Sequence, residues 1–187
     1  TLMVDEFSEL QGVMGGFYAQ KYGESSSVAQ AISEQYLPTS AKGDLPQSQV
    51  GALLALADKL DTLASFFSVG LIPTGSNDPY ALRRQAMGII EICLDQDWPI
   101  DFSDILLSYL QQSTIELRQE ILNFLKARVQ VLLENQTIDY DVIQASLNKT
   151  HLVPLRIVDA AILVQAFKEQ HPDQFHQMVE NLSRVVN

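Results

Sequence analysis

Apolar residues recur at helical spacing along almost the whole chain of 187 residues. The clearest case is the segment 115–135, whose apolar residues line one helix face: Leu117, Ile121, Leu125, Val129 and Leu132. No segment alternates apolar and polar residues over the length of a strand with turn residues on both sides. The periodicity therefore predicts an all-α fold, a helical bundle in which each helix buries one face in a shared core.

Capping residues and prolines divide this pattern into separate helices. The expected helices cover 4–22, 25–37, 48–69, 79–94, 101–112, 115–135, 139–147, 154–170 and 173–186. The helix 48–69 begins with the run GALLALA, which is apolar on most sides, and this predicts a central position in the core. Asp78 followed by Pro79 is typical of a helix start, with a carboxylate cap and a proline at the first helical position.

The charge balance limits the partners of the chain. It carries 12 basic and 23 acidic side chains, a net charge of −11, and both halves of the sequence are acidic. Proteins that coat nucleic acid by bulk charge neutralise several phosphates with Lys and Arg, so that class is excluded. Any contact with an anionic partner has to come from a local basic cluster.

Cysteine and hydropathy indicate the compartment. The single cysteine, Cys93, lies in an apolar run, so no internal disulfide can form and a buried position is expected. No apolar run reaches the length of about 18 residues that a membrane span needs, and no signal peptide is visible. The sequence therefore predicts a cytoplasmic protein with no membrane partner.

The organisation into domains is less sharply marked. The break at Trp98-Pro99 predicts a helical domain over 1–98 and a helical extension over 99–187, although the two could pack as one unit. The sequence starts at Thr1 without an initiator methionine, from which we expect a piece of a longer chain.

Basic residues form one adjacent pair, Arg83-Arg84. Arginine binds phosphate through two parallel hydrogen bonds and stacks on rings, so this pair is a candidate nucleic-acid contact, with Tyr80 expected on the same helix face as Arg84. The alternative, left open by the residues alone, is that the pair neutralises nearby acidic groups. Lys126 and Arg128 are two residues apart, do not share a face, and indicate a solvated helix surface.

Catalytic and metal-binding patterns are weak. Asp58 and Asp61 lie three residues apart on one helix face around Lys59, but the chain holds only three histidines, His151, His171 and His176, and none is in a His-Asp dipeptide. We therefore expect these carboxylates to cross-link the bundle through ion pairs, with no catalytic residue and no metal ligand in the chain. The loop 70–77 matches the glycine spacing of a phosphate loop, but Ser76 stands where lysine is required, which favours a simple connector.

Four blocks together resemble a known family. They are VDEFSELQGVMG at 4–15, GE at 23–24 with VAQAI at 28–32 and EQYLP at 34–38, ADKLDTL at 57–63, and PTGSNDPYALRR at 73–84. In this order they resemble the bacterial glycyl-tRNA synthetase beta subunit, strongly over 1–92 and more loosely afterwards. The departures are small, with Gln35, Ser65 and Tyr80 where His, Gly and Phe are common.

The resemblance implies a fold and a role. It implies an HD-domain-like helical bundle with additional C-terminal helices that lead toward an anticodon-binding domain. It also implies an enzyme of alpha and beta subunits that attaches glycine to tRNA(Gly), with ATP and Mg at the alpha subunit and no cofactor in this segment. The expected partners are tRNA(Gly), the alpha subunit and other beta-subunit domains, with Lys59, Arg83 and Arg84 as candidate tRNA contacts. The alternatives are an HD-type metal-dependent phosphohydrolase, disfavoured by the missing His-Asp pair, and a purely structural docking module.

Overall fold

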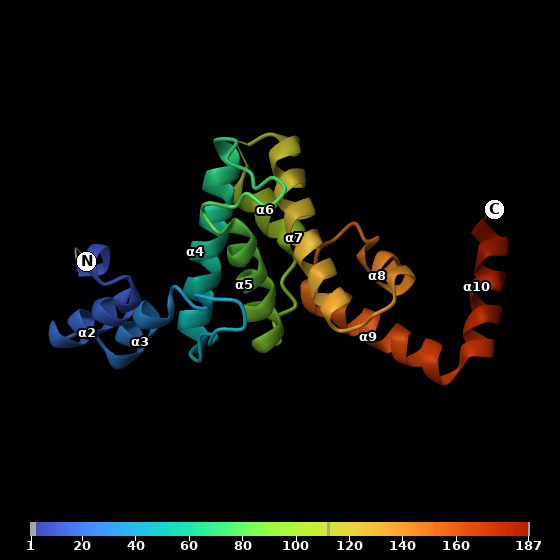
Figure 1. Ribbon diagram of the computed structural model, residues 1–187, viewed down its shortest axis with the longest axis horizontal. Coiled ribbons are helices and arrows are strands. Elements are labelled where there is room, and N and C mark those ends of the chain that lie inside the picture. Colours follow the sequence, from blue (N-terminus) through green and yellow to red (C-terminus); the bar gives the residue numbers. More distant parts are fainter. Residues whose placement is uncertain (1–2, 112, 187) are drawn as a thin grey trace.

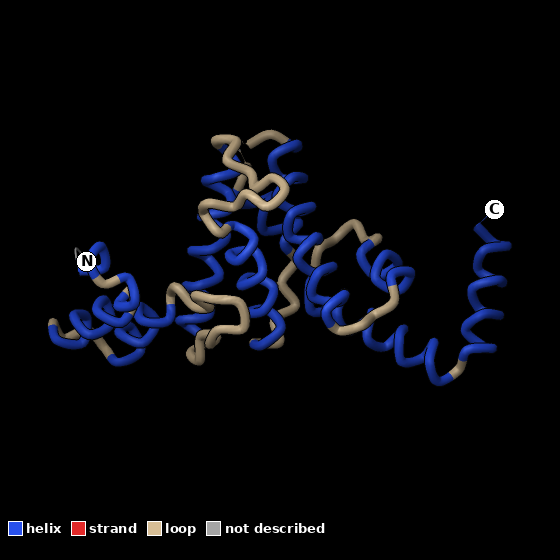
Figure 2. Tube along the Cα trace, in the orientation of Figure 1, coloured by secondary structure: helices blue, strands red, loops and turns tan. Residues whose placement is uncertain are grey.

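The computed structural model describes residues 3–111 and 113–186, and over these residues it contains ten α-helices, one short 3-10 helix and no strand (Figure 2). The helices are α1 (Met3–Glu6), η1 (Ser8–Leu10), α2 (Val13–Lys21), α3 (Ser26–Glu34), α4 (Gln49–Ser68), α5 (Leu82–Asp95), α6 (Phe102–Tyr109), α7 (Ile115–Asn135), α8 (Tyr140–Leu147), α9 (Pro154–Gln170) and α10 (Pro172–Val186). The all-α prediction is confirmed.

The helices form an elongated arrangement with a thick centre (Figure 1). Helices α4, α5, α6 and α7 make the centre, α1 to α3 lie at one end, and α8 and α9 lie at the other. Helix α4 packs against α3, α5 and α7, while α5 also packs against α7 and α9. Helix α10 packs on α9 and extends away from the body of the molecule.

Helix α4 takes a central position, as its apolar run predicts, although Leu53 and Leu54 of that run lie on an exposed side. Its buried residues are Gly51, Ala52, Ala55, Leu56, Lys59, Leu60, Leu63, Ala64 and Phe67. A continuous cluster of buried apolar side chains runs from Ala52 to Ala161 and includes residues of every helix from α4 to α9. This cluster crosses position 98 without a gap, and the division into 1–98 and 99–187 stays a prediction.

Side-chain caps explain several helix starts. Hydroxyl oxygens of Ser25, Ser48 and Thr114 accept hydrogen bonds from backbone N–H groups in the first turns of α3, α4 and α7. Pro154 occupies the first position of α9, where its missing N–H costs nothing. The predicted bounds 115–135 and 154–170 are confirmed for this reason.

The first predicted helix, 4–22, is wrong as a single element. It is divided into α1, η1 and α2, because the backbone at Gly12 adopts a left-handed conformation with φ of 80°. Gly12 also lies against α3, where an added Cβ would sit 2.7 Å from the backbone oxygen of Ser33. Apolar spacing does not reveal such a close approach between two backbones.

Helix α5 begins three residues later than predicted. Residues 79–81 form a turn, with Ala81 in the left-handed region at φ 53°, so Pro79 is not the first helical residue. Asp78 still caps the helix, since its two carboxylate oxygens accept hydrogen bonds from the N–H groups of Leu82 and Arg83 at 2.8 and 3.0 Å. Helix α6 ends at Tyr109. Thr1 and Gln112, where the sequence suggests an internal start and a helix end, lie outside the described residues.

Two further features bear on the environment of the chain. Cys93 is fully buried, and burial raises the pKa of its thiol to about 12, so it packs as a small apolar side chain. None of the described helices combines the length and the apolar character that crossing a membrane requires.

The contact between α2 and α3 gives a testable prediction. An added Cβ at Gly16 would lie 2.6 Å from the backbone oxygen of Ala29, whereas at Gly15 it would lie 2.8 Å from a methyl group of the Ile32 side chain, which can shift more easily than backbone. Gly16→Ala should therefore destabilise this pair by about 1–3 kcal/mol through overpacking, despite a helix-propensity gain of roughly 1 kcal/mol. Hydrogen exchange of the α3 amides should report at least about fivefold lower protection, since 1.4 kcal/mol is about a factor of ten. Gly15→Ala is the matched control, and equal protection in both variants would contradict the close contact.

Candidate functional site

A groove of about 520 Å³ collects basic side chains on one side of the central bundle. Its walls come from the loop after α3, from α5 and from the C-terminal end of α7. Lys42, Arg83 and Arg84 line it, together with the single carboxylate of Glu91. In a chain with a net charge of −11, this is the kind of local basic cluster that an anionic partner would require.

The two arginines of the groove have different environments. Arg84 is exposed, whereas Arg83 is half-buried and donates a hydrogen bond from Nη2 to the backbone oxygen of Gly75 at 2.8 Å. Arg83 therefore also holds the loop that precedes α5. Tyr80 does not lie beside Arg84 on a helix face as expected, because it belongs to the turn before α5 and its ring packs on Phe66 with centroids 4.5 Å apart.

A further arginine lies next to this cluster. Burial and the neighbouring charge of Arg83 lower the pKa of the Arg128 guanidinium, and Asp78 opposes this. Within the described residues the Nε atom of Arg128 is buried without a hydrogen-bond partner, and its guanidinium lies 5.6 Å from the centre of the Phe124 ring. The prediction that Lys126 and Arg128 form a solvated surface is wrong, because both are half-buried and Lys126 donates to the backbone oxygen of Lys149.

Lys59 lies behind the groove and not on its surface. Lys59 is 1% exposed, its stem runs against Gly88, and it donates from Nζ to the backbone oxygen of Tyr36 at 3.3 Å. Burial lowers the pKa of the Lys59 amine to about 8, with Asp58 raising it and Arg84 lowering it. The structure corrects the expected surface position of Lys59, so this residue is not among the cations that a partner could touch.

The carboxylates on either side of Lys59 bind neutral groups. Gln35 donates a hydrogen bond to Asp58 at 3.0 Å, and the Tyr109 hydroxyl donates one to Asp61. These contacts join α4 to the end of α3 and to α6. Asp58 and Asp61 therefore do cross-link the bundle, but through hydrogen bonds with uncharged side chains where the sequence suggested ion pairs.

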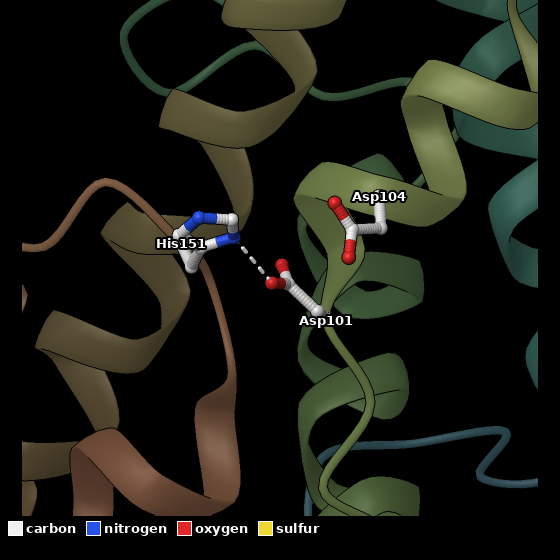
Figure 3. A group of neighbouring side chains, drawn as sticks. All are labelled: Asp101, Asp104 and His151. Carbon is white, nitrogen blue, oxygen red and sulfur yellow. Dashed lines mark hydrogen bonds and ion pairs between the residues drawn. The ribbon is translucent and has the colours of Figure 1, made fainter.

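Asp101, Asp104 and His151 form the one group of potential metal ligands among the described residues (Figure 3). One ligand atom from each lies within 4.8 Å of the others. The Asp101 carboxylate lies 2.6 Å from Nδ1 of His151 and also accepts a hydrogen bond from the N–H of Ser103 at the start of α6. Sequence reasoning missed this group, because His151 lies 50 positions from Asp101.

Hydrogen bonding accounts for the positions of Asp101 and His151. Two hydrogen bonds lie beside them: the N–H of Phe102 donates to the backbone oxygen of Leu152, and the N–H of Leu152 donates to the hydroxyl of Ser103. Burial opposes ionisation of Asp101, but hydrogen bonds from Ser103 and His151 outweigh it and lower the pKa of this carboxyl. The pair thus fastens the start of α6 to the segment before α9, and the absence of a metal ligand set stays a prediction.

Comparison with known proteins gives the family. The glycyl-tRNA synthetase beta subunit family matches residues 1–148. The whole chain is 46% identical to a segment of the glycine–tRNA ligase beta subunit of Lactobacillus gasseri and 49% identical to one of Streptococcus gordonii. The chain belongs to the glycyl-tRNA synthetase beta subunit family. It spans 28% of the length of each of these two relatives.

Family membership confirms the resemblance found in the sequence blocks. The block ADKLDTL forms the middle of α4, where it buries Lys59, Leu60 and Leu63, and PTGSNDPYALRR forms the loop, cap and first turn that bring Arg83 and Arg84 to the groove. Of the four blocks that carry the resemblance, these two therefore contribute to the core and to one wall of the basic groove, while the blocks at 4–15 and 23–38 form helices α1 to α3. Lys42 and Arg128 lie in no quoted block, and only the folded chain brings them near the arginine pair.

The buried amine of Lys59 gives a prediction with a defined sign. Between pH 8 and about 10.5 the folded state binds fewer protons than the unfolded chain, so Lys59 makes stability rise with pH there. The parent should gain up to about 1.4 kcal/mol per pH unit relative to Lys59→Met.

Urea unfolding from pH 7 to pH 10.5 measures this difference. The buried thiol of Cys93 has the opposite dependence, but it is present in both proteins and cancels. Lys149→Met, at an exposed position, should show a constant difference from the parent. A constant difference for Lys59→Met as well would contradict the buried amine.

The Asp101 cap gives a second prediction. Asp101→Ala should lower stability at pH 7 by about 1 kcal/mol through loss of the cap. Asp104→Ala, which removes a carboxylate of the same group without a cap, should cost a few tenths of a kcal/mol through the helix dipole. Because the folded-state pKa of Asp101 is lowered, its ionised contribution is present above the unfolded value and is lost as pH falls toward 3.

Thermal unfolding of both variants between pH 7 and pH 3 tests the cap. Adding Mn²⁺ to the parent should leave its melting temperature unchanged. A rise that disappears in His151→Ala would instead identify Asp101, Asp104 and His151 as a metal site.

Proposed function

We propose that this chain is a non-catalytic helical region of a glycyl-tRNA synthetase beta subunit that supports binding of tRNA(Gly). The observation that carries the proposal is the basic groove, which gathers Lys42, Arg83 and Arg84 on the surface of an otherwise acidic protein of this family. Arginine presents a planar fork that matches phosphate geometry, and exposed Arg84 is the residue best placed to use it.

The proposal includes the setting of the whole enzyme. The relatives are beta subunits of glycine–tRNA ligases, so the proposed partners are the alpha subunit, the other domains of the beta subunit and tRNA(Gly). The activity is ATP-dependent attachment of glycine to tRNA in the cytoplasm, with ATP and Mg at the alpha subunit. The likeness of this helical bundle to an HD domain is part of the proposal, and the all-α architecture supports it.

Arg83 and Lys59 have supporting roles in this proposal. Arg83 holds the carbonyl of Gly75 and faces the groove, so it both positions the loop and contributes charge. Lys59 contacts the carbonyl of Tyr36, two residues before Pro38 at the groove wall. It acts on the groove by fixing the start of the loop that carries Lys42.

Filter binding of tRNA(Gly) to the assembled alpha–beta enzyme tests the role of the groove. Each lost phosphate contact lowers the slope of log affinity against log salt by roughly 0.7–0.9. Arg84→Ala should produce one such reduction, and the double change of Arg83 and Arg84 to Ala should produce a larger one. Arg156→Ala, which removes an exposed arginine from the first turn of α9, is the matched control.

The possible results separate the candidate functions. Unchanged affinity and salt slope in both groove variants would exclude the tRNA role of this surface and leave a structural or docking module. A loss of affinity with an unchanged slope would show that the arginines act through the fold.

A further inference from the structure

The basic groove is larger than phosphate contacts alone require. Its volume of about 520 Å³ lies in the range of roughly 300–1,000 Å³ that is typical of small-molecule sites. Each of its three walls also contributes an apolar residue, Pro38, Met87 or Leu132. These residues are buried or half-buried, whereas Lys42 and Arg84 are exposed. An apolar interior with cations at its edge suits a ring that carries a phosphate.

Helix α5 places three kinds of side chain in a row along the groove. Arg84, Met87 and Glu91 follow one another at spacings of three and four residues, so they lie on one stripe of the helix. The first and the last are separated by about 10 Å along the helix axis. A nucleotide has the same order of groups, because its sugar and ring separate the anionic phosphate from the polar edge of the base.

The carboxylate of Glu91 is the feature that phosphate binding does not explain. A carboxylate repels phosphate, yet this one lines the groove and is half-buried. Burial raises the pKa of the Glu91 carboxyl, and over the described residues no hydrogen bond or charged neighbour offsets this effect. An ionised carboxylate only accepts hydrogen bonds. A ligand that fits here therefore has to bring donors to it.

Of the four RNA bases, guanine matches a carboxylate best. Its Watson–Crick edge presents two adjacent donors, N1–H and N2–H2, which can bind the two carboxylate oxygens together. Adenine and cytosine place an acceptor nitrogen beside their amino group, and uracil has a carbonyl oxygen on each side of N3–H, so these bases bring an acceptor against the carboxylate. The Watson–Crick edge is free only where a base is unpaired, as in loops and ends of RNA.

We propose that the groove binds an unpaired guanosine nucleotide of an RNA chain. The phosphate contacts Arg84 and Lys42 at the edge of the groove. The base packs on Met87 and Leu132, and its N1–H and N2–H2 groups donate to Glu91. This inference rests on the proposed function and deepens it, since tRNA binding through phosphates needs only charge, whereas this contact selects a base.

Photocrosslinking of a short RNA to the assembled alpha–beta enzyme tests the base contact. The probe is the pentanucleotide UUGUU with 6-thioguanosine at its centre, which keeps N1–H and N2–H2, and the crosslinked peptides are mapped by mass spectrometry. Unmodified UUGUU and UUIUU compete with the probe, because inosine differs from guanosine only in lacking the N2 amino group. We expect crosslinks in α5 or at the C-terminal end of α7. We expect UUIUU to compete about tenfold less well, the loss typical of a hydrogen bond to a charged group.

Three variants separate the base contact from the phosphate contact. Glu91→Gln keeps the shape of the side chain but replaces one acceptor oxygen by a donor, so UUGUU and UUIUU should then compete equally. Glu120→Gln, which neutralises an exposed carboxylate of α7, is the matched control and should keep the tenfold difference. Lys42→Gly removes a cation at a position whose φ of 60° suits glycine. It should weaken both competitors and leave their ratio unchanged.

Failure of this inference differs from failure of the proposed function. Equal competition by UUGUU and UUIUU in the parent, or crosslinks confined to other parts of the enzyme, would overturn the base contact. A reduced salt slope of tRNA binding in Arg84→Ala would still support the phosphate role. A tenfold ratio that persists in Glu91→Gln would also overturn the inference. Competition by 5′-GMP as strong as that by UUGUU would assign the groove to a free nucleotide and not to RNA.

Discussion

Burial of α4 on several sides at once is the constraint on which the rest of the structure depends. Its small and apolar residues Ala52, Ala55, Leu56, Leu60, Leu63 and Ala64 are buried, and α3, α5 and α7 all pack against the helix. This packing buries one amine. The stem of Lys59 lies along Gly88, and its Nζ donates a hydrogen bond to the backbone oxygen of Tyr36. A buried polar group needs such a partner, and this requirement ties the chain after α3 to the centre of the bundle.

The groove follows from the same arrangement. With α5 and α7 fixed on α4, the end of α7 and the loop before α4 lie on either side of the first turns of α5, where Arg83 and Arg84 are. The start of α5 is fixed by the hydrogen bond from Arg83 to the backbone oxygen of Gly75 and by the two hydrogen bonds that Asp78 accepts. These contacts set the position of the arginine pair in the groove. Apolar packing thus positions the helices, and a few hydrogen bonds position the basic side chains.

The sequence predicts what depends on local chemistry. Hydroxyl caps and prolines are local signals, and the bounds of α7 and α9 are correct to the residue. One error occurs where distant segments meet, at Gly12, which must pass close to Ser33. The other is local: the left-handed backbone at Ala81 delays the start of the helix that Asp78 caps. In the groove, the arginine pair is visible in the sequence. The burial of Lys59 and the approach of Lys42 and Arg128 depend on tertiary packing, which the sequence does not reveal. The Asp101–His151 contact spans 50 residues and leaves no local pattern.

Net charge and local charge act over different distances in this molecule. At physiological ionic strength interactions between exposed charges fade beyond roughly 8 Å, so the overall −11 weakens long-range attraction to RNA without cancelling a cation in direct contact with phosphate. Charge is unevenly placed: the N-terminal helices carry exposed acidic residues, whereas basic groups gather at the groove of the central bundle. A beta-subunit segment built in this way can present cations to phosphate at one surface although its net charge is negative. Its acidic composition is therefore consistent with a place in a tRNA-binding enzyme, because selectivity depends on where the few cations are held.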